Sequence, residues 1–286
     1  MKRKIKKNLS PTIKTDVKGI NTLLSLLHEA VKTNDHKIVF NKKSIYDFDG
    51  NLFCIYAYIA NQFIRKNNHL HIWPTNNCSV NAFMEKNLFG CSSNFDLILA
   101  EKLFLNCSRV FQNEKQDKLS MLSYLTHELI KPKWKSTLPY HYITRIKRFI
   151  NLYWEYTIDK SGAGNILIGS NFEDNVVSVT MIDTSFNLAR YASIFKPRVN
   201  NDYDALLWLL TNTFLKAKLQ RLFYSFKMYC QKNEGNLTVY AGSYALAIDK
   251  RGEYTISDTT VPITGLLVSF TIKTEMVQFD NYAIAA

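Results

Sequence analysis

Few residues in this 286-residue sequence have the types and spacing that catalysis or metal binding requires. His127-Glu128 begins like the zinc-binding H-E-x-x-H helix, but Lys131 stands where the second histidine is needed. His69 and His71 alternate along a short apolar segment and would face the same side of a strand, yet no third or fourth ligand accompanies them. These histidines are therefore typical of ordinary polar residues, and we predict no metal site.

The pair Gly164 and Gly169 has the glycine spacing of a phosphate-binding loop, whose backbone N–H groups surround phosphate. Ser170-Asn171 follows where that loop needs Lys and then Ser or Thr, so no lysine would reach the terminal phosphates. A G-x-S-x-G nucleophile turn and a paired Cys/His signature are also absent from the sequence. Motifs alone therefore do not identify an enzyme.

Alternating helix and strand patterns predict an α/β module in the first part of the chain. Helices are indicated where apolar residues recur with a period near 3.6, and Asp49 or Asn51 is placed to cap the second of them. Such alternation implies helices packed on a sheet through crossover connections. The predicted elements are helices at 17–33, 52–66 and 79–87, and strands at 37–40 and 69–73.

The second half predicts an α+β sandwich, because amphipathic helical segments are followed by several alternating strand segments. The helices are expected at 119–130, 139–154 and 204–229. The strands are expected at 165–170, 176–182, 237–241, 245–249 and 266–274, with 171–175 as a hairpin loop. Segment 96–104 is compatible with either a strand or a helix.

The composition is that of a globular protein, with 47% hydrophobic residues and 13% aromatic residues. No segment approaches the roughly 20 apolar residues of a membrane helix, and no apolar run follows the basic opening as it would in a signal peptide. We therefore expect a cytoplasmic protein that does not span a membrane. The five cysteines form no C-x-x-C pair and are expected to be reduced and mostly buried.

The formal net charge of +12 is concentrated, because the first 20 residues carry seven basic side chains and one acidic one. This segment is either an arm that neutralises nucleic-acid phosphates or a solvated, frayed terminus. A second basic stretch at 131–148 contains Trp134, Tyr140 and Tyr142; it would bind nucleic acid or form the polar face of a helix. The arm residues are Lys2, Arg3, Lys4, Lys6 and Lys7.

Five pieces of the second half occur in the order seen in the GHKL ATPase family (gyrase, Hsp90, histidine kinases and MutL), and the chain resembles that family. In it, a helix carries a catalytic glutamate and a metal-binding asparagine, and a strand ends in an adenine-binding aspartate. Residues 17–92 resemble a STAS-like module, with Phe89-Gly90 after its last helix. The five matching pieces are the helix end at 152–156 and the segments 165–169, 177–183, 233–240 and 265–272.

The resemblance implies Glu155 as the base that activates water, but Asp159 stands where the asparagine is expected. An aspartate could still hold Mg²⁺, whereas alignment on Ser161 puts Tyr156 at the metal position. In either alignment the family's pair of catalytic glutamate and metal-binding asparagine is incomplete. The other reading of Glu155 is a carboxylate on the helix surface.

The glycine boxes that surround the nucleotide in this family are also altered. The first should read Asp-x-Gly-x-Gly; here it is Asp183-Thr184-Ser185-Phe186-Asn187, so the aspartate is kept and both glycines are replaced. The region of the second, 215–219, contains no glycine to bring backbone N–H groups against phosphate. Asp183 is therefore either a surviving adenine acceptor or a residue that caps the next turn.

Together these features predict an α/β and α+β fold, a STAS-like amino-terminal α/β module followed by a GHKL-like α/β sandwich. The expected segments are a basic arm (1–16), the module (17–92), a connector (93–118), the sandwich (119–275) and a tail (276–286). The expected function is that of a degenerate ATPase-like regulatory or scaffold subunit that binds a partner protein, with a role in bacterial defence or a toxin–antitoxin system as an expectation from the resemblance.

Two alternatives stay open at this point. One is a nucleic-acid-binding accessory protein that uses the basic arm. The other is a weak ATP-binding switch, with ATP and Mg²⁺ held by Asp183, Glu155 and Asp159 if the pocket survives.

Overall fold

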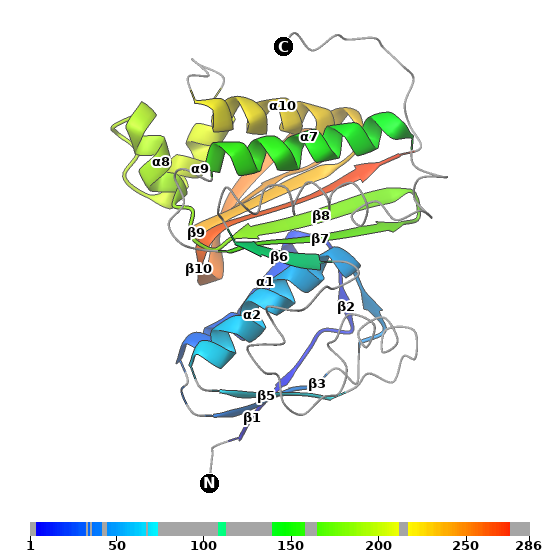
Figure 1. Ribbon diagram of the computed structural model, residues 1–286, viewed down its shortest axis with the longest axis vertical. Coiled ribbons are helices and arrows are strands. Elements are labelled where there is room, and N and C mark those ends of the chain that lie inside the picture. The colour runs from blue at the N-terminus through cyan, green and yellow to red at the C-terminus, as the bar shows by residue number, and fades with distance from the viewer. Residues whose placement is uncertain are drawn as a thin grey trace.

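The computed structural model of the chain describes residues 4–32, 34, 36–41, 45–66, 68–73, 108–112, 139–157, 165–211 and 217–274. The helices predicted at 79–87 and 119–130, the undecided segment 96–104, Asp159 and the tail lie outside these residues. Figure 1 shows the described elements stacked in layers, with α7 and α10 at one end and a small sheet at the other.

The central layer is a five-stranded sheet in which every pair of neighbours is antiparallel, in the order β6-β7-β8-β10-β9. This arrangement confirms the predicted α+β fold. Its strands are β6 (Ser108–Gln112), β7 (Asn165–Glu173), β8 (Val176–Asp183), β9 (Asn236–Ile248) and β10 (Tyr254–Lys273). The first of these comes from the predicted connector, so that segment contributes a strand to the sheet.

Both faces of this sheet are covered, as the burial of nearly all of β8 indicates. Because side chains alternate along a strand, Val179 and Met181 belong to the core under α7 (Tyr140–Thr157) and α10 (Lys218–Lys232). Ile182 belongs to a second core, on the other side of the sheet. Phe149 of α7 and Phe226 of α10 stack in the first core with ring centroids 3.9 Å apart.

The second core is formed with α1 (Val17–Lys32) and α2 (Phe53–Arg65), which lie between the central sheet and a small parallel sheet (Figure 1). The parallel sheet has the order β1-β3-β5 and is connected through these two helices, so this part is the expected α/β arrangement. Its strands are β1 (Lys4–Asn8), β3 (Lys37–Asn41) and β5 (His69–Trp73).

A short parallel pair, β2 (Thr12–Ile13) with β4 (Asp47–Phe48), and a 3-10 turn, η1 (Gly50–Leu52), join the two parts of the molecule. The turn lies directly on the central sheet, because a Cβ atom added to Gly169 of β7 would collide with the backbone oxygen of Asn51. A glycine is thus required there for η1 to approach β7. The segment predicted as a basic arm contains β1 and β2, so part of it belongs to sheets.

Several predicted elements differ from the structure. The hairpin loop is only Asp174-Asn175, because both residues have positive φ and form the two-residue turn that suits the twist of paired strands. The helix predicted at 204–229 is two helices, α9 (Asp202–Leu210) and α10. The side chain of Gln220 donates to the carbonyl oxygens of Trp208 and Thr211 and so closes the end of α9.

One helix was missed, α8 (Leu188–Phe195), and two predicted strands, 237–241 and 245–249, are one strand. β9 continues through Gly242, whose φ of +52° accompanies the irregular pairing with β10. Strand β10 is also much longer than the predicted 266–274.

Candidate functional site

Asp183, the predicted adenine acceptor, ends β8 with a side chain that is 0% exposed. Its Oδ1 atom accepts three hydrogen bonds, each 3.1 Å long, from the backbone N–H and the hydroxyl of Ser185 and from the backbone N–H of Phe186. These bonds close a turn directly after the strand, which is the capping geometry that an aspartate favours. The structure therefore places this carboxylate in its own turn.

The residues that replace the two glycines continue this turn into α8. Phe186 is buried and packs against Tyr191, with ring centroids 5.4 Å apart. Asn187 is the N-cap of α8, and its side-chain oxygen accepts from the backbone N–H of Arg190 at 2.8 Å. Residues 183–187 thus form a turn that is followed directly by the N-cap of α8.

Two neighbours enclose the Asp183 end of β8. Gly265 of β10 has a φ of +97°, and a Cβ atom there would collide with the backbone oxygen of Asp183. Tyr153 of α7 is buried, and burial followed by the negative charge of Asp183 raises the pKa of its hydroxyl well above the usual range. Among the described residues this hydroxyl has no hydrogen-bond partner.

Glu155, the predicted base, lies on the opposite side of α7 from this turn. Its side chain is exposed, and its carboxylate accepts from the Asn151 amide at 3.3 Å. The adjacent residues Tyr153 and Trp154 are the ones that point into the core. The structure therefore does not bring Glu155 and Asp183 together, and Asp159 is outside the described residues.

The region of the second glycine box begins α10. Ala217 and Leu219 are buried, whereas Lys218 is exposed and its Nζ lies 5.8 Å from the centre of the Tyr156 ring. This contact has the geometry of a cation–π interaction. The Lys218 side chain is thus held against α7 on the outer surface of the helix layer.

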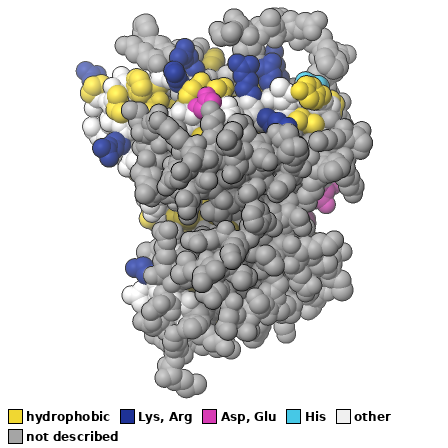
Figure 2. Space-filling model, viewed as in Figure 1, with side chains coloured by type: hydrophobic (Ala, Val, Ile, Leu, Met, Phe, Trp, Pro, Cys, Tyr) yellow, Lys and Arg dark blue, Asp and Glu magenta, His cyan; other side chains and the backbone are white. Residues whose placement is uncertain are grey.

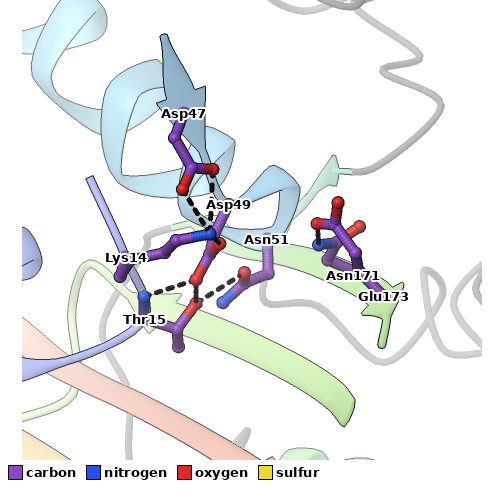
Figure 3. A network of polar contacts seen from close by, with 7 residues as sticks. All are labelled: Lys14, Thr15, Asp47, Asp49, Asn51, Asn171 and Glu173. Atoms are coloured by element: carbon purple, nitrogen blue, oxygen red, sulfur yellow. Dashed lines mark hydrogen bonds and ion pairs between the residues drawn. The ribbon is translucent and has the colours of Figure 1, made fainter. Parts of the chain in front are cut away.

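A polar network where η1 meets the sheet was not predicted as a site (Figure 3). Lys14 lies between two carboxylates, with its Nζ 2.7 Å from Asp47 Oδ2 and 3.2 Å from Asp49 Oδ1. Burial lowers the pKa of Lys14, but the two carboxylates outweigh it and the net shift is upward. Asn171 and Glu173, also drawn, form a separate pair on β7.

Of the two caps predicted at this turn, Asp49 is wrong, because it occupies the N-cap position of η1 without making a capping bond. Its Oδ2 instead accepts from the backbone N–H of Thr15 at 2.6 Å and from the Thr15 hydroxyl at 2.7 Å. Asn51 Oδ1 lies 2.9 Å from the oxygen of the same hydroxyl. The carboxylate is therefore used to hold the chain before α1 against the chain before α2.

From Asn51 the network continues into the sheet. Its amide donates to Thr180 Oγ1 at 2.7 Å, and the Thr180 hydroxyl lies 2.8 Å from that of Ser269. All three side chains are buried, so each bond replaces one to water. The arrangement links the η1 turn to the central sheet. The polar run Asp47–Asn51 before an apolar helix was the only sequence feature that could have indicated this network. The residues that it contacts are distant in the sequence, so the network itself could not be predicted.

The described part of the chain has neither a cluster suited to a metal nor a helix suited to a membrane. No group of three or more His, Cys, Asp or Glu side chains in it has the arrangement of a metal site. None of its helices combines the length and the apolar character that crossing a membrane requires.

Comparison with known proteins gives little. No protein-family model and no curated protein matches the chain. Among solved structures, the histidine kinase AdeS of Acinetobacter baumannii is similar to it at 8% sequence identity, with 90% of this chain and 98% of that chain covered and a TM-score of 0.27. A likeness this weak does not establish a shared fold, and the GHKL-like and STAS-like resemblances remain predictions.

Proposed function

We propose that this chain is a non-catalytic regulatory or scaffold protein with a degenerate GHKL-like sandwich, and that it acts by binding a partner protein. One observation carries the proposal: the retained Asp183 carboxylate is fully buried and accepts three hydrogen bonds from its own turn. An adenine amino group would have to compete with those bonds, and Phe186 fills the core beside them. The aspartate then serves the fold and no longer a nucleotide.

The position of Glu155 supports the same proposal. General base catalysis needs the base within hydrogen-bond reach of the attacking water, close to the bound phosphates. Glu155 instead points to solvent from the outer side of α7, while Asp183 lies beneath that helix. A nucleotide contacting Asp183 would be separated from this carboxylate by the helix itself.

An exposed apolar surface on α8 and α9 supports the role in protein binding. Ile194 is 62% exposed, Phe195 37% and Tyr203 41%, and Arg190 and other basic residues lie among them. Figure 2 shows hydrophobic side chains gathered with Lys and Arg at this corner of the molecule. Neighbouring large apolar side chains on a surface are typical of contact sites.

Phosphate release from ATP by the full chain tests the non-catalytic part of the proposal. We expect release at the background of the preparation, unchanged in Glu155→Ala, because the carboxylate is remote from Asp183. Steady release that disappears in Glu155→Ala but persists in Asn151→Ala would show a working catalytic glutamate and overturn the proposal.

Affinity capture from the source cells, read by mass spectrometry, tests the partner-binding part. We expect a protein captured by the wild type to be lost with Ile194→Glu, which places a charge in the apolar surface, and kept with Ser25→Glu, an exposed site on α1. Capture of nothing above background, or equal capture by both variants, would contradict the proposed surface.

A further inference from the structure

Two regions of this protein together account for its whole formal net charge, because the charges of all other residues cancel. The first 20 residues have a net charge of +6, and α7 and α10 together carry the other +6, from seven basic residues and the single acid Glu155. The remaining residues are balanced, since these two regions account for the whole of the +12. Figure 1 places α7 and α10 at one end of the molecule and β1 at the other.

The two helices form one continuous surface because they pack antiparallel. Tyr142 near the start of α7 contacts Tyr229 near the end of α10, and Tyr153 near the end of α7 contacts Phe223. The buried side chains of both helices point to the sheet, and basic side chains lie on the sides that remain. Arg148 of α7 and Lys218, Arg221 and Lys232 of α10 are exposed, whereas Arg145, Lys147 and Lys227 are half-buried.

Two acidic residues among the described ones lie at, or just beyond, the ends of these helices. Glu155 is at the end of α7 and accepts a hydrogen bond from Asn151. Glu234, just beyond α10, is bound to Lys273 of β10 at 2.9 Å. Figure 2 shows separate groups of Lys and Arg side chains along the top of the molecule, with hydrophobic and acidic side chains between them. Arg148 and Arg221 are both exposed to solvent.

We propose that the outer surface of α7 and α10 binds the phosphate backbone of a nucleic acid. An 18-residue helix such as α7 is about 27 Å long, which matches roughly eight base pairs along a duplex. Lysine and arginine spread over such a length can each meet a phosphate and release its counterions. This surface is separate from the basic arm and from the apolar surface on α8 and α9, so the inference does not depend on the proposed function.

Fluorescence anisotropy with a labelled mixed-sequence DNA duplex of about 20 base pairs tests the inference on the full chain. We expect the logarithm of the wild-type binding constant to fall linearly with the logarithm of salt concentration between about 50 and 200 mM. Arg148→Ala with Arg221→Ala should weaken binding roughly tenfold at the lower salt and make the slope shallower by about two. Arg148→Lys with Arg221→Lys keeps both charges and should bind like the wild type.

The matched control is Lys18→Ala with Lys32→Ala, which removes two exposed charges from α1 on the other side of the sheet. We expect it to bind like the wild type. Equal weakening by both alanine pairs would assign the binding to overall charge and overturn the inference. It would also be overturned if the wild type bound phosphatidylserine vesicles but neither duplex nor single-stranded DNA, or if it bound none of them.

Discussion

The backbone N–H of Phe186 donates to Asp183 Oδ1 at 3.1 Å, and this bond joins the end of β8 to the start of the turn before α8. Both residues are buried, so the bond lies inside the core and not at a surface open to a ligand. An aspartate that resembles an adenine acceptor in sequence is therefore a turn-closing residue in space.

Replacing Asp183 should test its structural role. Asp183→Ala leaves the N–H groups of Ser185 and Phe186 without their acceptor, and we expect it to lower the free energy of unfolding by about 1–3 kcal/mol per buried group left unpaired. Asp183→Asn keeps an Oδ1 acceptor and should cost less. Urea denaturation measures both, and equal stability of all three proteins would contradict the role.

The hydrogen bond between Asn51 of η1 and Thr180 of β8 should stabilise the contact between the turn and the central sheet. Thr180→Val keeps the shape of the side chain but removes the acceptor of the buried Asn51 amide, so we expect a loss of about 1–3 kcal/mol in urea denaturation. The control is Thr238→Val, because Thr238 pairs with Ser269 from the other neighbouring strand and has no bond to Asn51. A larger loss in the control than in Thr180→Val would argue against the network.

The hydroxyl of Tyr153 should contribute nothing to the stability of the folded protein. The group is buried beside Asp183 without a hydrogen-bond partner among the described residues, so its burial is unfavourable. We expect Tyr153→Phe to leave the free energy of unfolding unchanged or to raise it by up to about 1 kcal/mol. Tyr142→Phe is the contrast, since it removes a bond to Asn233 and should destabilise the protein. A marked loss of stability in Tyr153→Phe would reveal a partner for that hydroxyl.

The thiols of Cys54 and Cys230 should be protected in the native protein. Both are buried, and burial raises the pKa of each thiol far above its ordinary value of 9.0. Iodoacetamide at pH 8 should modify them only after unfolding, as peptide mass spectrometry can show. Rapid modification of either residue in the folded protein would contradict the burial.

The raised pKa values of the Cys54 and Cys230 thiols also predict how the stability of the protein depends on pH. Above about pH 9 the unfolded thiols lose their protons while the native ones keep them, so the native state holds more protons and stability falls as the pH rises. Urea denaturation at increasing pH measures this, and Cys54→Ala with Cys230→Ala should show a weaker dependence. An unchanged dependence in that variant would assign it to other groups.

Much of the local structure was predictable from hydrophobic periodicity. The strand at 69–73 has its predicted bounds, and α1 differs from its prediction by one residue, because both have clear apolar patterns and polar ends. The buried cysteines at 54 and 230 are also as predicted. β1 was missed because Lys4, Lys6 and Lys7 read as a solvated arm, whereas its pairing with β3 makes it an edge strand.

The arrangement of the layers could not be predicted, because it depends on contacts between distant residues. Asn51 and Thr180 are separated by 129 positions, and no sequence pattern around either residue predicts the contact between them. The end of α9 depends in the same way on Gln220, a residue of the next helix. The candidate residue Asp183 was identified, but its hydrogen-bond partners decide its role, and those follow only from the turn geometry.

Isothermal titration of the full chain with ATP, with and without Mg²⁺, tests the central claim most directly. Because the Asp183 carboxylate is closed on Ser185 and Phe186, we predict no detectable heat of binding up to millimolar ATP under either condition. Micromolar binding that Asp183→Asn abolishes, while Glu155→Ala leaves it intact, would contradict the account, since it would show that the aspartate still receives an adenine.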